Sequence, residues 1–98
     1  MTLGTSAIGI FSEGNNKVNN FGNIKVGATN TNGDPSNLEK HENSVGIYLA
    51  GGSTGLNTTS GNITVNYEHS VGVYVTGLGT SFINEGIINI DNGGIGIL

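Results

Sequence analysis

Short runs that alternate apolar residues with small or polar ones recur along the chain and predict β-strands. The clearest run, SVGVYV, spans residues 70–75, and close copies stand at 7–11, 44–49 and 94–98. Each copy has a glycine between two aliphatic residues, and these are Gly9, Gly46, Gly72 and Gly96. The spacings between successive glycines are 37, 26 and 24 residues. A period of about 20 to 50 residues is typical of solenoids. The pattern therefore predicts a repeat protein.

A second strand motif, Gly-x-Ile-x-Val/Ile, follows the first three copies. Its glycines lie 13, 15 and 14 residues after those of the first motif, at Gly22, Gly61 and Gly86. A weaker apolar position falls between the two motifs, at Val18, Leu56 and Phe82. Three strand positions in each repeat predict a three-sided coil.

No window repeats apolar residues at the helical spacing, and successive repeats copy one another in register, which an antiparallel sandwich does not require. We therefore predict an all-β fold, a right-handed single-stranded parallel β-helix of about three and a half rungs. Equivalent residues would stack about 4.8 Å apart. The predicted inward columns are Val45, Val71 and Ile95; Ile47, Val73 and Ile97; and Ile24, Ile63 and Ile88.

One interval breaks the period. Gly22 and Gly46 are 24 residues apart, whereas Gly61 to Gly72 takes 11, so about 13 residues are inserted within 27–43. This stretch holds the only proline, Pro35, and a cluster of charged residues, which predicts a solvated loop leaving the coil at a corner. We assign residues 1–98 to one β-helix segment of a larger repeat protein, with a loop insertion at 27–43.

Aromatic residues recur at one repeat position, next to the inward aliphatics. Phe11, Tyr48 and Tyr74 have the opposite parity to the inward residues, so they should form an outward ladder. Such a ladder stabilises stacked strands, and it is also a surface that a partner can contact. Together with the charged insertion it supplies the candidate partner-binding residues: Asp34, Glu39, Lys40, His41, Glu42, Tyr48 and Tyr74.

The composition narrows the classes of function. The formal net charge is −4, with three lysines and no arginine, so the basic surface that binds nucleic acid is missing. No apolar run approaches the ~20 residues of a membrane helix, so we expect no direct membrane insertion. Because cysteine is absent, stability must come from burial and hydrogen bonding rather than from disulfides.

Residues that could carry chemistry do not form convergent patterns. Residues 51–55, GGSTG, match the Gly-x-Ser-x-Gly motif, but no helix or triad follows Ser53, so we interpret the segment as a turn. His41 and His69 occupy different repeat positions and should not stack. The carboxylates of Glu68, Glu85 and Asp91 share no column. We therefore expect a non-enzymatic protein with no metal site and no cofactor.

The two motifs, Ser-Val-Gly-Ile/Val-Tyr and Gly-x-Ile-x-Val at a period near 25, resemble the parallel β-helix passenger repeats of bacterial type V secreted autotransporter adhesins. The resemblance implies a structural or adhesive segment on the bacterial cell surface or outside the cell, exported by a signal and a barrel not present in this segment. Its partners would be the neighbouring rungs of the parent chain and a cell-surface protein or glycan. The alternatives are a fragment of a β-helix carbohydrate-active enzyme and a phage or secreted fibre repeat.

Both end rungs should expose open strand edges above an apolar core. We therefore expect the isolated 98-residue segment to be unfolded or to associate end to end rather than to behave as a stable monomer.

Overall fold

The structure, a computed structural model, describes residues 1, 3, 6–27, 29–30, 38–39, 43–66, 69–91 and 93–98. These residues contain no helix, and hence none that is long and apolar enough to cross a membrane. The strands are β1 (Ile8–Ser12), β2 (Lys17–Asn20), β3 (Asn23–Gly27), β4 (Thr29–Asn30), β5 (Leu38–Glu39), β6 (Val45–Leu49), β7 (Thr54–Asn57), β8 (Asn62–Asn66), β9 (Val71–Val75), β10 (Ser81–Asn84), β11 (Ile87–Asp91) and β12 (Ile95–Ile97).

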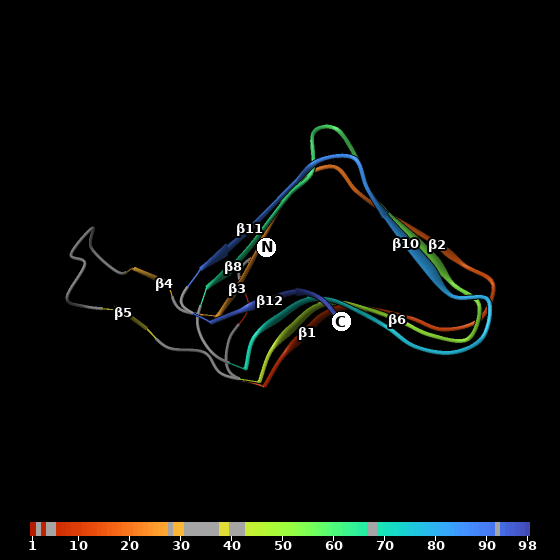
Figure 1. Cartoon of the computed structure of the whole chain (residues 1–98), viewed down its shortest axis with the longest axis horizontal. Coiled ribbons are helices and arrows are strands. Elements are labelled where there is room, and N and C mark those ends of the chain that lie inside the picture. Colours follow the sequence, from red (N-terminus) through yellow and green to blue (C-terminus); the bar gives the residue numbers. More distant parts are fainter. Residues whose placement is uncertain are drawn as a thin grey trace.

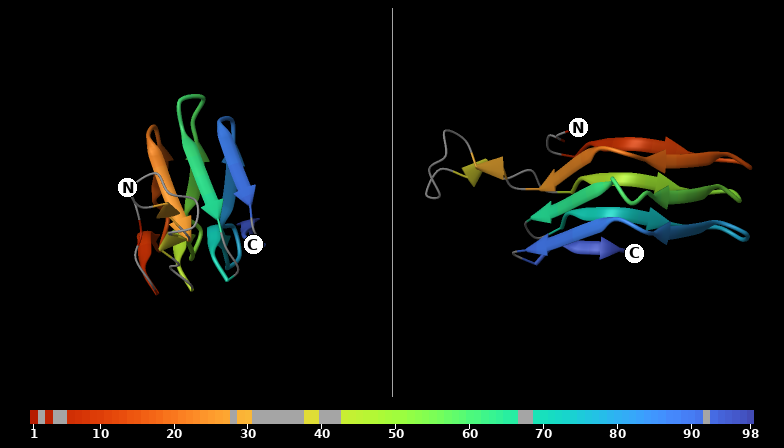
Figure 2. Two further views of the ribbon diagram at one scale, coloured as in Figure 1. Left: turned by 90° about the vertical axis from the view of Figure 1, so that its left-hand side faces the viewer. Right: turned by 90° about the horizontal axis from the view of Figure 1, so that it is seen from above.

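Ten of these strands form the three sides of a coil that is triangular in cross-section (Figure 1). The first sheet has the order β1-β6-β9-β12, the second β10-β7-β2 and the third β11-β8-β3, and all pairs in them are parallel. Figure 2 shows the rungs stacked side by side from the N-terminal to the C-terminal end. The predicted fold class, a right-handed parallel β-helix, is confirmed.

The inward columns hold the rungs together through buried aliphatic contacts. Ile24, Ile63 and Ile88 are paired in register in the third sheet, as predicted. Ile47 and Val73 are paired in the first sheet and are both fully buried, whereas Ile97 in the last strand is 51% exposed. The column is the predicted one, and it is covered wherever a further rung lies against it.

The predicted inward column of Val45, Val71 and Ile95 is wrong in its direction. The three residues are paired in register, but the two valines are only half-buried, Ile95 is exposed, and none belongs to the core cluster. The glycine that follows each of them faces the interior instead. A Cβ on Gly46 would lie 3.1 Å from Val26 and 3.2 Å from Ile24.

The central glycines also interrupt the ladder. Gly46 and Gly72 are left out of the pairing between β6 and β9, although the residues on both sides are paired. The first-sheet strands curve across the base of the triangle (Figure 1). The bend turns two successive positions inward, the glycine and Ile47, so simple alternation fails here.

The predicted equivalence of Leu56 with Val18 and Phe82 is wrong. The residue that aligns with Val18 and Phe82 is Gly55, and Leu56 aligns with Asn19 and Ile83 on the outer face. A Cβ on Gly55 would lie 2.6 Å from Leu49 Cδ1 and 2.9 Å from Phe82 Cδ1. The larger neighbours fill the space that a side chain would need, so the middle rung carries glycine at the inward position.

The corners between the sheets absorb the differences in repeat length. Within the insertion, β4 and β5 form an antiparallel pair that lies outside the triangle (Figure 1). At the corner that enters the first sheet, equivalent residues of successive rungs all have positive φ: Ser6 (54°), Asn43 (60°), His69 (61°) and Gly93 (84°). This left-handed residue fixes the direction in which the chain re-enters the sheet.

Among the described residues, open strand edges are present at both ends of the coil, as expected, except along β3 at the N-terminal end. Leu3 N donates to the Lys25 carbonyl oxygen (3.0 Å) and Lys25 N to the Met1 carbonyl oxygen (2.8 Å), so this segment lies along the edge of β3. Leu3 is buried against the core. At the other end, no described residue pairs with the outer edges of β10 and β11.

Val73 provides a direct test of the inward register. Substitution of Val73 by Ala should lower the free energy of unfolding by about 1 to 3 kcal/mol, because it removes buried methyl groups and leaves a cavity. The matched control is Val71→Ala in the same strand, which should cost less than about 0.5 kcal/mol because Val71 lies outside the core. Equal thermal melts for the two variants would contradict the register.

Association through the C-terminal rung can be tested with two isoleucines of β11. Ile90 is in the inward column with Val26 and Val65, and it is 52% exposed because β11 is the outermost described strand of its sheet. Ile90→Lys should abolish concentration-dependent association of the chain in sedimentation velocity, since an inward charge blocks further stacking. Ile87→Lys adds the same charge at an outward position that is 55% exposed, and it should leave association unchanged. If the unsubstituted 98-residue chain sediments as a folded monomer at every concentration, the end-to-end model is wrong.

Candidate functional site

The predicted outward aromatic ladder is present on the first sheet. The ring centroids of Phe11 and Tyr48 are 5.1 Å apart, those of Tyr48 and Tyr74 are 4.9 Å apart, and both ring pairs are stacked with an interplanar angle of 24°. Phe11 is exposed and the two tyrosines are half-buried. The ladder lies beside the column of Ile8, Val45 and Val71, which also faces outward.

The stacking limits how a partner can contact the ladder. Both faces of the Tyr48 ring are covered by its neighbours, so the ring presents its edge to the surroundings. An aromatic platform that stacks on a sugar ring needs an open face, and the Tyr48 ring has none. The ladder is therefore a stabilising element whose edges form an apolar strip.

The other candidate partner-binding residues belong to the insertion. Glu39 lies in β5, where its backbone is paired with that of Thr29. Asp34, Lys40, His41 and Glu42 lie outside the described residues. Of the candidate residues, the structure therefore brings together Tyr48 and Tyr74, while the role of the insertion stays a prediction.

Ser53 is part of a turn, as predicted. Gly51 and Gly52 have φ values of 61° and 91°, which place them in the left-handed region that glycine adopts readily. Ser53 is fully buried, and its hydroxyl donates to the Gly14 carbonyl oxygen at 2.7 Å and contacts Ser12 Oγ at 3.1 Å. This hydroxyl holds adjacent rungs together rather than facing a substrate.

The described titratable side chains are dispersed. His69 is exposed at a corner, where its carbonyl oxygen accepts a hydrogen bond from Asn43 N, while His41 lies outside the described residues. Among the described residues, no three His, Asp or Glu side chains are grouped as a metal site would require. Asp91 stands at a corner, where its carbonyl oxygen accepts a hydrogen bond from Gly94 N (3.1 Å).

An asparagine ladder at the corner between the second and third sheets was not predicted. Asn57 is fully buried; its Oδ1 accepts from Asn20 Nδ2 (2.9 Å), and its Nδ2 donates to Asn84 Oδ1 (2.8 Å) and to the Ile87 carbonyl oxygen (3.2 Å). The signal in the sequence is Asn-x-Gly before the second motif at Asn20 and Asn84. In the middle rung three residues rather than one separate Asn57 from Gly61, so this copy does not match the Asn-x-Gly pattern.

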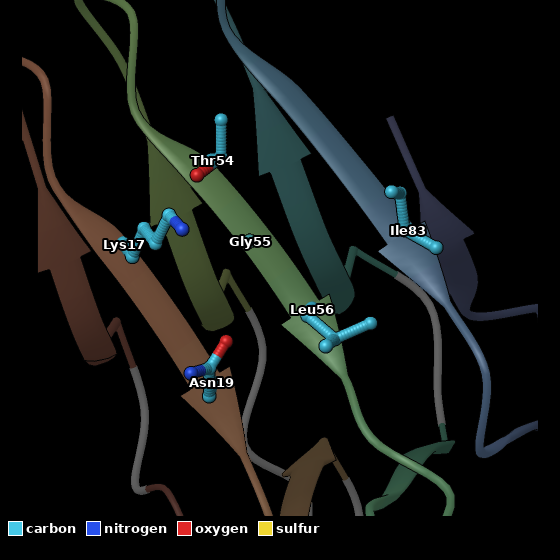
Figure 3. Close-up of a pocket in the computed structure, with 6 residues that line it drawn as sticks. All are labelled: Lys17, Asn19, Thr54, Gly55, Leu56 and Ile83. Carbon is cyan, nitrogen blue, oxygen red and sulfur yellow. The ribbon is translucent and has the colours of Figure 1, made fainter.

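A shallow groove lies on the outer face of the second sheet (Figure 3). It encloses about 200 Å³ and draws residues from all three strands of the sheet: Lys17, Asn19, Thr54, Gly55, Leu56 and Ile83. The apolar pattern of the sequence does not predict this groove, because it aligns Leu56 with Val18 and Phe82 rather than with Asn19 and Ile83. Correct alternation from Gly55 places Leu56 beside Ile83, and this pairing is the signal that could have found the groove.

Nearly the whole chain matches one protein family. Residues 1–94 match the family model described as the BigA third pectate lyase-like domain. The chain belongs to this family. The match accounts for the three-sheet parallel coil, and domains of this family are parts of surface-exposed bacterial proteins. Neither the search of curated proteins nor that of solved structures gave a match.

The asparagine ladder yields a stability prediction. Asn57→Ala should lower the free energy of unfolding by about 2 to 3 kcal/mol, because it leaves buried amide and carbonyl groups without partners. Asn89→Ala is the control: Asn89 is exposed and makes one long side-chain hydrogen bond, to Asn62 Oδ1 at 3.4 Å. Chemical denaturation should separate the two variants, and a cost at Asn57 no larger than at Asn89 would remove the ladder from the account of stability.

Proposed function

We propose that this domain is a non-enzymatic display segment of an exported bacterial passenger protein, and that it holds adhesive loops on a rigid coil. In this role the parallel ladders provide stiffness, and the corners present the groups that contact a host-cell protein or glycan. Export by the autotransporter route is part of the proposal and rests on the resemblance of the repeat motifs.

The internal hydrogen bonding supports a load-carrying role. Among the described residues, every buried side-chain nitrogen and oxygen has a hydrogen-bond partner. The buried polar groups at the corners bind neighbouring rungs: Asn57 binds its equivalents Asn20 and Asn84, and Ser53 binds Ser12. Polar networks that are fully satisfied make a structure rigid and specify its register.

The observation that carries the proposal is the position of the insertion. It leaves the coil between the third and first sheets, and its strands β4 and β5 pair with each other outside the triangle. A loop at a corner can vary in length and sequence without changing the stacked ladders, which is how rigid scaffolds usually carry binding functions.

The arrangement of described carboxylates supports a non-enzymatic role. Outside the insertion, which contains Glu39, the described carboxylates are Glu13 between the first and second sheets, Glu85 between the second and third, and Asp91 at the end of β11. Hydrolysis of a glycosidic bond commonly requires two carboxyl groups about 5 to 10 Å apart on either side of the bond. These three belong to three different corners, so they do not form such a pair.

Deletion of residues 29–40 from the intact parent protein tests the adhesive role. Gly27 and Val45 are 18 positions apart, so the deletion leaves six, close to the five between Asn66 and Val71 in the next rung. We expect most of the adhesion to host cells to be lost while the circular dichroism spectrum keeps its β-sheet signal.

The matched control replaces residues 29–40 by a Gly/Ser segment of equal length. Loss of adhesion in both variants would assign binding to the side chains of the insertion, whereas loss only in the deletion would point to its length. Unchanged adhesion in both would exclude the insertion and make the Phe11, Tyr48 and Tyr74 face the next candidate.

A further inference from the structure

The groove on the second sheet has two unlike walls. Residues two apart in a strand point to the same face, so the register defines two rows that run along the coil axis. One row is polar and consists of Lys17, Thr54 and Ser81. The other row has one polar and two aliphatic members, which are Asn19, Leu56 and Ile83. The rows are about 6.6 Å apart at 3.3 Å per residue, and the backbone of Gly55 lies between them.

The size of the groove favours a single anchoring side chain. Its volume of about 200 Å³ is below the roughly 300 to 1,000 Å³ of pockets that enclose a small-molecule ligand. Its apolar wall is accessible: Ile83 is 60% exposed and Leu56 is half-buried. A leucine-sized side chain placed there would cover both.

The polar groups around this apolar centre are available for binding. Within the described part of the chain, the side chains of Lys17, Asn19 and Thr54 make no hydrogen bond or ion pair with one another or with any other group. The outward side chains of the second sheet include no carboxylate. The ammonium group of Lys17 therefore lacks an acidic partner in a chain whose net charge is −4.

We propose that this groove is a docking site for an extended segment of a partner protein that presents one leucine-sized apolar side chain next to a carboxylate. The apolar side chain packs on Leu56 and Ile83, and the carboxylate meets Lys17, while Asn19 and Thr54 bind the segment's backbone. An apolar centre with a polar rim is the usual anatomy of a protein interface. The aliphatic walls offer no ring on which a sugar could stack. The inference deepens the proposed adhesive function and rests on it.

Peptide binding to the full chain tests the proposal. Three dye-labelled eight-residue peptides in a Gly/Ser background would carry Asp-Leu, Asn-Leu or Asp-Ala at the centre, and fluorescence anisotropy would be followed as the chain is added. Asp-Leu should bind about ten-fold or more tightly than Asp-Ala, because the leucine buries apolar surface. It should bind about 1.5- to 5-fold more tightly than Asn-Leu, as expected for an exposed ion pair.

Variants of the chain assign these preferences to the groove. Lys17→Gln should remove the advantage of Asp-Leu over Asn-Leu and keep that of leucine over alanine. Leu56→Ser should reduce the leucine advantage, and Ile83→Ser repeats this test should the first variant fail to fold. The control is Lys25→Gln, because Lys25 is an exposed lysine of the same rung on the third sheet and does not line the groove. It should change neither preference.

Several results would overturn the proposal. These are equal binding of the three peptides, preferences that Lys17→Gln and Leu56→Ser leave intact, and displacement of the peptide by lactose, which would indicate a glycan site. If Leu56→Ser instead lowers self-association of the chain, the occupant is a second copy and the proposed partner is wrong. Failure here would leave the adhesive role of the insertion standing, because deletion of residues 29–40 tests that role without involving the groove.

Discussion

The stacking of each residue on its equivalent in the next rung is the constraint on which the rest of this structure depends. The parallel pairing of the rungs places each residue about 4.8 Å from its equivalent in the next rung, so every position must tolerate contact with its own copy. Aliphatic residues do so by packing in columns, as at Ile47 and Val73. Asparagine does so by donating to one neighbour and accepting from the other, as at Asn57. Aromatic rings do so by stacking, as at Tyr48 and Tyr74.

This constraint explains which parts of the fold could be predicted from the sequence. The register of the strands can be predicted from the repeated glycine and aliphatic residues, because all rungs share one register and each copy of the motif indicates it. The direction of a single side chain is a local property. The bend at Gly46 reversed the expected direction of Val45, and the two extra residues after Asn57 concealed its ladder. Neither feature has a signal in the alternation of apolar residues.

The candidate surfaces were predictable to different degrees for the same reason. The aromatic ladder recurs at one repeat position, so its outward direction could be derived from parity alone. The groove draws on Lys17, Leu56 and Ile83, which are unlike one another and become neighbours only through the register of the second sheet. A site formed by unlike residues of successive rungs does not repeat along the sequence, so the repeat pattern does not predict it.

The direction of the ladder hydrogen bonds has a mechanical consequence. In all three sheets these bonds link one rung to the next along the coil axis. The steps between successive strands of the first sheet are 37 residues across the insertion and 26 and 24 residues in the two rungs without it. Tension between the two ends of the coil would load the outermost rung first and peel it away before the next one is strained. Each rung released in this way adds about 80 to 90 Å of extended chain. A protein built from such coils lengthens stepwise under tension, while the rungs that have not been peeled away keep their fold.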